Sequence, residues 1–355
     1  MPNQADIAKA LGITQATVSR ALRGDRSISA ETRQAVQNTA ERLRYNPNNY
    51  LSTLMSNIRS GKKLRGKGSI GLLIEASSLE DWYAIEAFRT FHQGVLQRAR
   101  ELGVHVDPFF LKQPGMSATK IDEILHARGI EGLILAPPYR GNRTLNMRWE
   151  RYAAIGVGFG WEEQELNRVA YDNLQCFITA FNELRRMGYQ RIGTVLDNIF
   201  IDGNRHGINW YIGYLECQDR IPKSDRVPVF KANYPLPGEK ISETDAALLE
   251  NRFQAWVSKW KPDALLTVVG DERKWLEAMN LRIPQDVGLA CLSLPIGSDL
   301  AGIEDAGEAV GATAIELVAA QIARNEFGLP SHQKVMMIES RWINGTTVQN
   351  KNQGV

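Results

Sequence analysis

The chain has 355 residues, 43% apolar and 23% charged, the composition of an ordinary globular protein that is too long for one core. No run of about 18 apolar residues occurs and the start lacks the apolar centre of a signal peptide, so we expect a cytoplasmic protein without a membrane span. The three cysteines are far apart and the five histidines show no metal-ligand spacing, which predicts free thiols and neither metal nor cofactor.

The net charge of +2 is unevenly distributed along the chain. Residues 1–68 hold 12 of the 42 Lys and Arg but only 4 of the 40 Asp and Glu, a charge of +8, which leaves −6 for the remainder. A basic N-terminal segment on an acidic body predicts a polyanionic partner, although a solvated basic surface would give the same balance.

The N-terminal segment, or head, predicts three short helices. Their apolar stripes are Ile7, Ala8 and Leu11, then Val18 and Leu22, then Val36, Ala40 and Leu43. Gly12 separates the first helix from the second, and Thr14 and Ser29 are good N-caps for the second and third. A short hinge helix is expected at about 48–56, within a head of residues 1–58, and a basic, glycine-rich linker at 59–68.

Residues 69–347, the body, alternate between near-continuous apolar runs and helical stretches. The expected strands are "SIGLLIE", "VHVDPFF", "GLILAP", "AAIGVGF", "RIGTVL", "ALLTVV" and "VGLACLSL". The expected helices are 84–102, 117–128, 174–187, 241–260 and 305–325. This alternation predicts parallel sheets covered by helices. Because the body is too long for one such sheet, we expect two α/β subdomains. Their predicted extents are about 69–167 with 303–330, and about 168–302 with 331–347.

The glycines of "GVGFG", residues 156–160, lack the spacing of a dinucleotide-binding fingerprint, and no helix clearly starts there. We interpret them as a strand end.

The stretch "DIAKALGITQATVSRAL", residues 6–22, has the length and spacing of a helix-turn-helix, whose second helix enters the DNA major groove. The candidate DNA contacts on this helix are Thr14, Gln15, Ala16, Thr17, Ser19 and Arg20. Glutamine can read adenine, and an alanine or threonine methyl can contact thymine. Ser19 and Arg20 can reach phosphates or a guanine edge. An exposed helix face remains the alternative for Gln15 and Arg20.

The head continues with "ISAETRQAVQNTAERLRYNPN" and "LSTL". In order and spacing, the whole head resembles the LacI/GalR family of bacterial transcriptional regulators. The body resembles it more weakly, through "YDN" at 171–173, "MGYQRIG", "KPDALLTVV", "IPQDVGL" and "SRWINGTT". The resemblance implies an all-α helix-turn-helix head on a periplasmic-binding-protein-like body of two parallel-sheet subdomains. It also implies an effector cleft between the subdomains and a homodimer that binds a near-palindromic operator.

The same resemblance extends the DNA-binding set beyond the second helix. Arg23 and Arg26 become candidate base or backbone contacts, unless they are solvated loop charges. Leu54 falls where the family places a leucine that wedges into the minor groove and kinks the duplex, unless it only packs against Tyr50 or its dimer mate. The linker is about eight residues longer than expected for the family, and could add phosphate contacts or loosen the coupling of head to body.

The predicted effector cleft departs from the sugar-binding pattern of the family. The candidate effector contacts are Trp82, Tyr83, Trp161, Trp210, Asp271 and Ser293. Trp210 stands where sugar-binding members usually carry arginine, Gly158 replaces an aspartate, and Ser293 with Leu294 replaces an aspartate pair. One alternative is a carbohydrate that stacks on the aromatic side chains. The other is a more apolar ligand, or a cleft partly filled by its own tryptophans, since a buried tryptophan usually belongs to a core.

The sequence therefore predicts a repressor of a catabolic operon, bound to double-stranded DNA in the nucleoid as a homodimer and controlled by a small molecule, possibly a sugar. The alternative is a dimeric DNA-binding regulator without a small-molecule effector. An enzyme is not expected, because the sequence shows no nucleophile elbow, phosphate loop or suggestive pairing of histidine with a carboxylate.

Overall fold

The computed structural model of the chain describes residues 4–22, 28–42, 69–138, 145–161, 164–198, 201, 208–234, 241–268 and 272–353. The expected hinge helix and linker lie outside these residues, as do Arg23, Arg26, Leu54 and Asp271. The chain divides into two compact units, Met1–Lys62 and Lys63–Val355.

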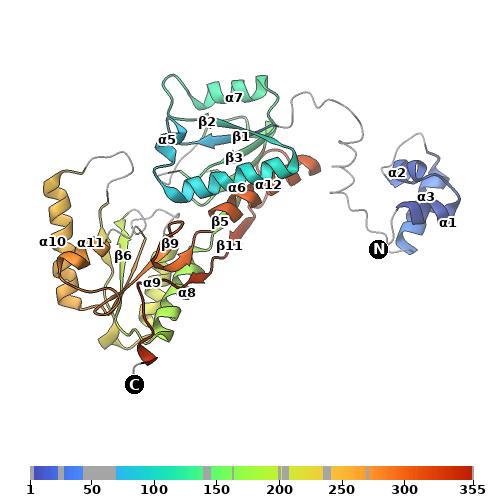
Figure 1. Cartoon of the computed structure of the whole chain (residues 1–355). Helices are drawn as coiled ribbons and strands as arrows, with labels where there is room; N and C mark the ends of the chain where they lie inside the picture. Colours follow the sequence, from blue (N-terminus) through green and yellow to red (C-terminus); the bar gives the residue numbers. More distant parts are fainter. Residues whose placement is uncertain are drawn as a thin grey trace. The chain divides into compact units, whose positions relative to one another are not determined.

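The described residues of the first unit form three helices, drawn in blue in Figure 1, which are α1 (Gln4–Leu11), α2 (Gln15–Leu22) and α3 (Ala30–Arg42). Their small core contains Ile7, Ala8, Val18, Ala21, Val36 and Ala40, with Leu11, Ile13, Leu22 and Ile28 packed around it. The predicted apolar stripes thus face one another, and the three-helix prediction is confirmed for the described residues.

The second unit begins with a six-stranded parallel sheet in the order β11-β5-β4-β3-β1-β2. Its strands are β1 (Ser69–Ile74), β2 (His105–Phe110), β3 (Gly132–Leu135), β4 (Ala153–Val157), β5 (Asn167–Tyr171) and β11 (Val335–Ile338). Its helices are α5 (Leu79–Trp82), α6 (Glu86–Leu102), α7 (Ala118–Ala127) and α12 (Gly307–Arg324), with a short 3-10 turn, η1 (Trp149–Arg151). Figure 1 shows α6 and α12 on one face of this sheet and α7 on the other.

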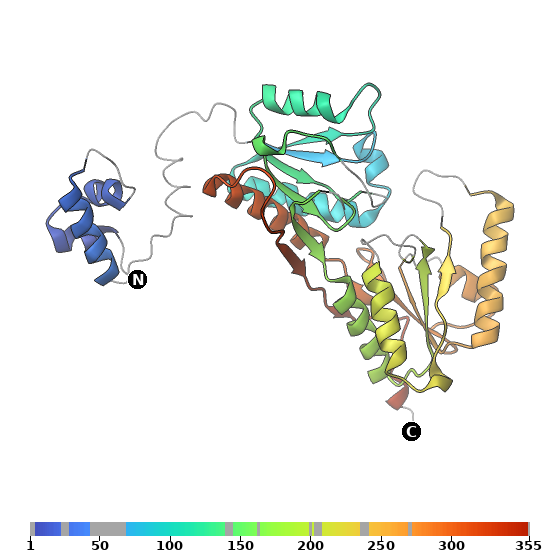
Figure 2. The same cartoon turned by 180° about the vertical axis from the view of Figure 1, so that it is seen from behind.

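A second six-stranded sheet has the order β12-β10-β9-β8-β6-β7. Its strands are β6 (Ile192–Asp197), β7 (Phe230–Ala232), β8 (Ala264–Thr267), β9 (Gly288–Leu294), β10 (Ala301–Glu304) and β12 (Trp342–Ile343). Its helices are α8 (Asn173–Arg186), α9 (Ile208–Asp219), α10 (Glu243–Trp260) and α11 (Glu272–Ala278), with 3-10 turns η3 (Lys223–Asp225) and η4 (Lys351–Gln353). Helices α8 and α9 cover one face and α10 and α11 the other, as Figure 2 shows from behind. Only β12 runs antiparallel among the paired strands that the structure describes.

The two parallel-dominated sheets confirm the predicted α/β body of two subdomains, but the expected subdomain bounds need correction. β5 pairs with β4 and β11, so 168–171 belongs to the first subdomain, and so does β11 itself. β10 pairs with β9 and β12, which places 303–304 in the second. The chain therefore crosses between the subdomains at 172, at 305–306 and at 339–341.

All three cysteines are free and buried, as the sequence predicts. Burial raises the pKa of the Cys217 and Cys291 thiols to about 12 and also raises the pKa of Cys176. These thiols are therefore protonated and poorly reactive at neutral pH. In the described part of the chain, each helix is too short or too polar to cross a membrane.

Candidate DNA-binding face and effector site

The turn that joins α1 to α2 is fixed by its own backbone bonds. Gly12 adopts a left-handed conformation with φ of +64°, and the Ile13 N–H donates to the Ala8 carbonyl at 3.1 Å. This is the six-to-one bond of a Schellman helix end, and the Ile13 side chain packs on the head core beside Ala8. The geometry redirects the chain within three residues, so that α2 starts at Gln15.

The start of α2 is capped as predicted. The Thr14 hydroxyl accepts a hydrogen bond from the Thr17 N–H at 3.2 Å, and the two threonine hydroxyls are 2.8 Å apart. Ser29 caps α3 in the same way, accepting from the Thr32 N–H at 3.2 Å. Thr14 and Thr17 thus serve local structure, and such a cap stabilises a helix by about 1 kcal/mol.

Helix α2 presents polar side chains on the face opposite its anchors. Val18 is fully buried and Ala21 nearly so, whereas Gln15 and Arg20 are exposed and Ser19 is partly exposed. Gln15 and Ser19 are four residues apart and therefore lie on one face of the helix. Of the predicted DNA contacts, Gln15, Thr17, Ser19 and Arg20 thus lie together on one short helix. The side chain of Ala16 is outside the part of the chain that the structure describes.

In the body, the structure places two of the predicted effector contacts in the hydrophobic core. Trp82 is fully buried between Phe88 and Phe91, and its Nε1 donates to the Pro137 carbonyl at 3.5 Å. Trp161 is 1% exposed, and its Nε1 donates to the Ala136 carbonyl at 2.8 Å. Both indoles therefore cover the carboxyl end of β3, a central strand of the first sheet. Both tryptophans are therefore core side chains in this structure.

The loop that carries Trp161 is held by a buried arginine on β5. The Arg168 guanidinium, in a side chain 4% exposed, donates to the carbonyls of Gly158 at 3.2 Å, Gln164 at 2.6 Å and Trp161. Three carbonyls at intervals of three residues thus solvate one buried cation. Gly158 itself follows β4 with φ of +68°, which confirms that "GVGFG" is a strand end.

Tyr83 lies at the rim of the Trp82 cluster and pairs with a buried histidine. Its hydroxyl is 2.5 Å from Nδ1 of His92, and the Arg89 guanidinium lies 5.6 Å from its ring centre. Burial lowers the pKa of His92, which favours a neutral imidazole that can accept the phenol proton. Burial also raises the pKa of Tyr83, with Arg89 opposing the shift. Tyr83 is therefore a fixed polar group at the edge of an aromatic core.

The remaining candidates belong to the second subdomain. Trp210 is 9% exposed and packs in the α8–α9 core, away from the clusters that hold Trp82 and Trp161. Ser293 is partly exposed near the end of β9, and its carbonyl accepts from the Cys291 thiol at 3.1 Å. The three tryptophans thus occupy three different cores, so the structure does not gather them into one aromatic box.

A polar and aromatic group that the sequence did not point to lies at the carboxyl end of the second sheet. The Tyr234 N–H donates to Asp197 at 2.7 Å, and the Tyr234 hydroxyl donates to Oε1 of the fully buried Glu272 at 2.6 Å. Its ring stacks on Trp275, with centroids 6.1 Å apart and 13° between the planes. Tyr234 is therefore fixed at its backbone, ring and hydroxyl while remaining partly exposed.

One weak signal in the sequence lay close to this group of residues. Tyr234 follows a three-residue edge strand, β7, which is too short to recognise from its pattern. Glu272 directly follows the predicted contact Asp271. We call Tyr234, Glu272, Trp275 and Asp197 the Tyr234 platform.

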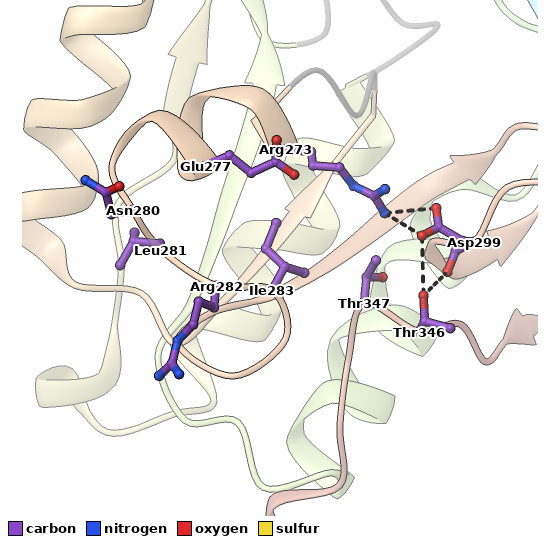
Figure 3. A pocket seen from close by; sticks show the side chains of 9 residues that line it. All are labelled: Arg273, Glu277, Asn280, Leu281, Arg282, Ile283, Asp299, Thr346 and Thr347. Atoms are coloured by element: carbon purple, nitrogen blue, oxygen red, sulfur yellow. Dashed lines mark hydrogen bonds and ion pairs between the residues drawn. The ribbon is translucent and has the colours of Figure 1, made fainter.

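A cavity of about 470 Å³ lies on the second subdomain, and Figure 3 shows the side chains that line it. Its lining consists of Arg273, Glu277, Asn280, Leu281, Arg282, Ile283, Asp299, Thr346 and Thr347. Arg273 donates to both carboxylate oxygens of Asp299, at 2.9 and 3.0 Å, and Arg282 is paired with Asp286. The two arginines of the lining are thus each paired with an aspartate.

Comparison with known proteins gives the head a clear relationship. Residues 5–48 match the family model described as "Bacterial regulatory proteins, lacI family". The chain is 29% identical over 199 residues to the regulator MalR of Streptomyces coelicolor, covering 54% of this chain and 53% of that protein. It thus spans about half the length of this relative. It is 23% identical to the uncharacterised regulator YkvZ of Bacillus subtilis, over 98% of this chain and 100% of that one.

Solved structures of similar fold cover almost the whole chain. One is the complex of the transcriptional regulator CelR with cellobiose, with a TM-score of 0.60, 16% identity and coverage of 98% of this chain and 100% of that one. Another is the lac repressor dimer bound to operator and the anti-inducer ONPF, with a TM-score of 0.54, 15% identity and coverage of 98% and 99%. At these identities the likeness establishes the fold.

The fold and the two sites define a two-part protein, a helix-turn-helix head joined to a body of two parallel-dominated α/β subdomains. Residues 5–48 of the head match the lacI family model, and the chain is similar in sequence to bacterial transcriptional regulators of that kind.

Proposed function

We propose that this protein is a transcription repressor that binds a near-palindromic operator as a homodimer and responds to a carbohydrate. The observation that carries the DNA-binding part is the presentation of Gln15, Ser19 and Arg20 on α2, anchored by Val18 and capped by Thr14. A short helix with small polar residues at its start can approach base edges closely in the major groove.

In this proposal, residues 1–58 are the head, 59–68 the linker, and a hinge helix at about 48–56 places Leu54 in the minor groove. Arg23 and Arg26 would add contacts beyond α2. A homodimer would place two copies of α2 in successive major grooves, which explains the expected two-fold symmetry of the site.

Binding-site selection from random duplex DNA with the full-length protein tests this assignment. The expected product is an inverted repeat whose half-sites change when Gln15 is replaced. Recovery of no sequence preference, with binding equally strong to all duplexes, would contradict the proposal.

For the effector, the Tyr234 platform supports a carbohydrate. A tyrosine ring held on one face by Trp275 is preorganised, so a sugar ring could stack on its accessible part without ordering a mobile side chain. Relatives of similar fold are described with cellobiose and with ribose, the latter from Enterococcus faecium with a TM-score of 0.57. Asp271, Ser293, Trp210 and Tyr83 remain candidate neighbours of the same ligand.

The alternative function, a dimeric DNA-binding regulator without an effector, is favoured by one specific observation. Trp82 and Trp161 already occupy the carboxyl end of β3 and donate to its last carbonyls. A thermal-shift screen of the full chain against monosaccharides and disaccharides separates the two functions. A ligand that binds only the folded state raises the melting temperature, by mass action, whereas an effector-free regulator gives no shift with any sugar.

A further inference from the structure

The three crossovers between the subdomains are tied to one another by short bonds. The Asp172 N–H of the first crossover donates to the Ile338 carbonyl at 3.0 Å. The Glu304 N–H donates to the Arg341 carbonyl at 2.9 Å, and the side chains of this pair form an ion pair at 2.7 Å. A cavity of about 570 Å³ opens beside the second and third crossovers.

Asp305, in the second crossover, connects this region to the first subdomain. Its Oδ1 accepts from the Gly307 N–H at 2.6 Å, which caps the start of α12. Its Oδ2 accepts from the Thr90 hydroxyl of α6 at 3.1 Å, and that hydroxyl also lies 3.0 Å from the Ala87 carbonyl. One carboxylate therefore joins the crossover to two helices of the first subdomain.

The backbones of α6 and α12 touch at this point because glycines remove the side chains between them. A Cβ on Gly307 would lie 2.0 Å from Thr90 Oγ1, and one on Gly311 would lie 2.1 Å from the Phe91 carbonyl oxygen. A Cβ on Gly94 would lie 2.1 Å from the Glu308 carbonyl oxygen. Figures 1 and 2 both show the two helices side by side. The start of α12 is thus a rigid part of the first subdomain.

These contacts confine the second crossover to a single pivot. Glu304 is held to the second subdomain as the last residue of β10, opposite Leu294 of β9, and Asp305 is held to the first subdomain through Thr90. Any rotation of one subdomain against the other must therefore turn the backbone between these two neighbouring residues. Without the bond to Thr90, the crossover would also turn at Asp305 and Ala306.

We propose that the hydrogen bond between Asp305 and Thr90 is a latch that fixes this pivot and sets the resting orientation of the two subdomains. Asp305 is then a positioning residue for the effector response. This inference rests on the proposed function for its purpose, since the orientation of the subdomains is what an effector would change.

The test uses the full chain with one spin label on each subdomain, introduced by Ala127→Cys on α7 and Ala255→Cys on α10. Both alanines are exposed, and the three native cysteines are buried thiols that a labelling reagent reaches poorly. Double electron–electron resonance then measures the distribution of distances between the labels, with neither sugar nor DNA present.

The decisive variant is Thr90→Val, which removes the hydroxyl and keeps the shape of the side chain and the cap on α12. A hydrogen bond to a charged group typically changes a two-state ratio by about tenfold or more, so the distribution should shift or gain a second component. Asp305→Ala should change it in the same direction, and the double variant should add little to Asp305→Ala. Glu308→Gln is the matched control, since it removes an exposed carboxylate on the same helix start and should leave the distances unchanged.

A Thr90→Val distribution identical to that of the unsubstituted chain would overturn the latch, because only the capping role of Asp305 would remain. A shift of equal size in Glu308→Gln would overturn it too, since the effect would then be general charge removal. If Asp305→Ala does not fold, the Thr90→Val comparison still decides. Failure of the latch leaves the sugar and DNA experiments untouched, so the two proposals fail separately.

Discussion

Replacing Tyr234 by phenylalanine and by alanine separates the contribution of its hydroxyl to stability from the contribution of its ring to ligand binding. The phenylalanine variant loses only the hydroxyl, which donates to Oε1 of Glu272 at 2.6 Å. Because Glu272 is fully buried, its carboxyl group loses one hydrogen bond that water cannot easily replace, at a cost of about 1–3 kcal/mol. For a body of this size, each kcal/mol lowers the melting temperature by roughly 2–4 °C.

The aromatic ring should decide ligand binding. Tyr234→Phe keeps the ring against Trp275, so the melting temperature falls but the rise caused by a bound sugar persists. Tyr234→Ala removes the stacking surface and should abolish that rise, which amounts to about 2.7 kcal/mol of stabilisation when the sugar is present at 100 times its dissociation constant. Differential scanning calorimetry with and without the sugar measures both effects.

A matched control is Tyr211→Ala. Tyr211 also stacks on an aromatic neighbour, Tyr214, at 5.8 Å, but it lies on α9 away from the end of a strand. It should lower the melting temperature without affecting the response to sugar. If Tyr234→Ala kept the full response, the Tyr234 platform would not be the sugar site. If Tyr234→Phe lost the response as completely as Tyr234→Ala, the hydroxyl and not the ring would make the contact.

Four further outcomes are expected. Gln15→Ala should relax base preference at one operator position by about 1–3 kcal/mol, and Ala16→Gln should change it; an unchanged selected sequence from both variants would remove them from direct readout. The isolated body, residues 69–355, should bind operator far more weakly than the full chain, whose log affinity should fall with log salt by about 0.9 per phosphate contact. Leu54→Ala should weaken specific binding more than nonspecific binding and reduce DNA bending; equal bends in a phasing assay would make it a packing residue. Asp122, buried on α7, accepts hydrogen bonds from the Arg148 guanidinium at 2.8 Å and the Tyr152 hydroxyl at 2.9 Å, so Asp122→Asn should lower the melting temperature at pH 7. Burial opposes ionisation of Asp122, yet its hydrogen bonds hold its pKa below the usual 3.8, so its stabilisation should disappear as pH falls through that range.

The structure of the head was predictable from the sequence because the spacing of apolar residues and the N-caps of its helices agree with how the helices pack. The positions Ile7, Val18 and Val36 form the core that their spacing predicts, and Thr14 and Ser29 accept the expected cap bonds. In three short helices nearly every buried residue lies on a helix with a clear apolar face. The DNA-binding face follows as the opposite side of the same pattern, which is why it could be predicted before any tertiary contact was known.

The strands of the body were most predictable where they are long and their burial is continuous. The central strands β1, β4, β6 and β9 appear as apolar runs, but β7 has three residues and β12 two. Helix α9 is apolar on more than one side, with exposed Ile212 and Leu215, so its sequence "INWYIGYLECQD" gives no clear periodicity. β5 was missed because Arg168 interrupts its apolar pattern, although the guanidinium is buried and donates to carbonyls of the loop that precedes the strand.

The proposed effector site was least predictable because its members meet only in the folded chain. Tyr234 and Glu272 are 38 residues apart, and neither stands out until the sheet order β8-β6-β7 brings the segments that follow β7 and β8 to the same edge of the sheet. The tryptophans that do stand out in sequence, Trp82 and Trp161, use their indole N–H groups on backbone carbonyls of their own subdomain. Large aromatic side chains are conspicuous in a sequence, but burial decides whether they face a ligand or a core.

Since the first subdomain fills the end of its central strand with its own side chains, the polar and aromatic contacts to an effector should come mainly from the second subdomain. An effector held mostly by one subdomain can still control the other, provided that few residues connect the two. The pivot between Glu304 and Asp305 meets that condition, because the bonds on either side of it leave the second crossover a single place to turn.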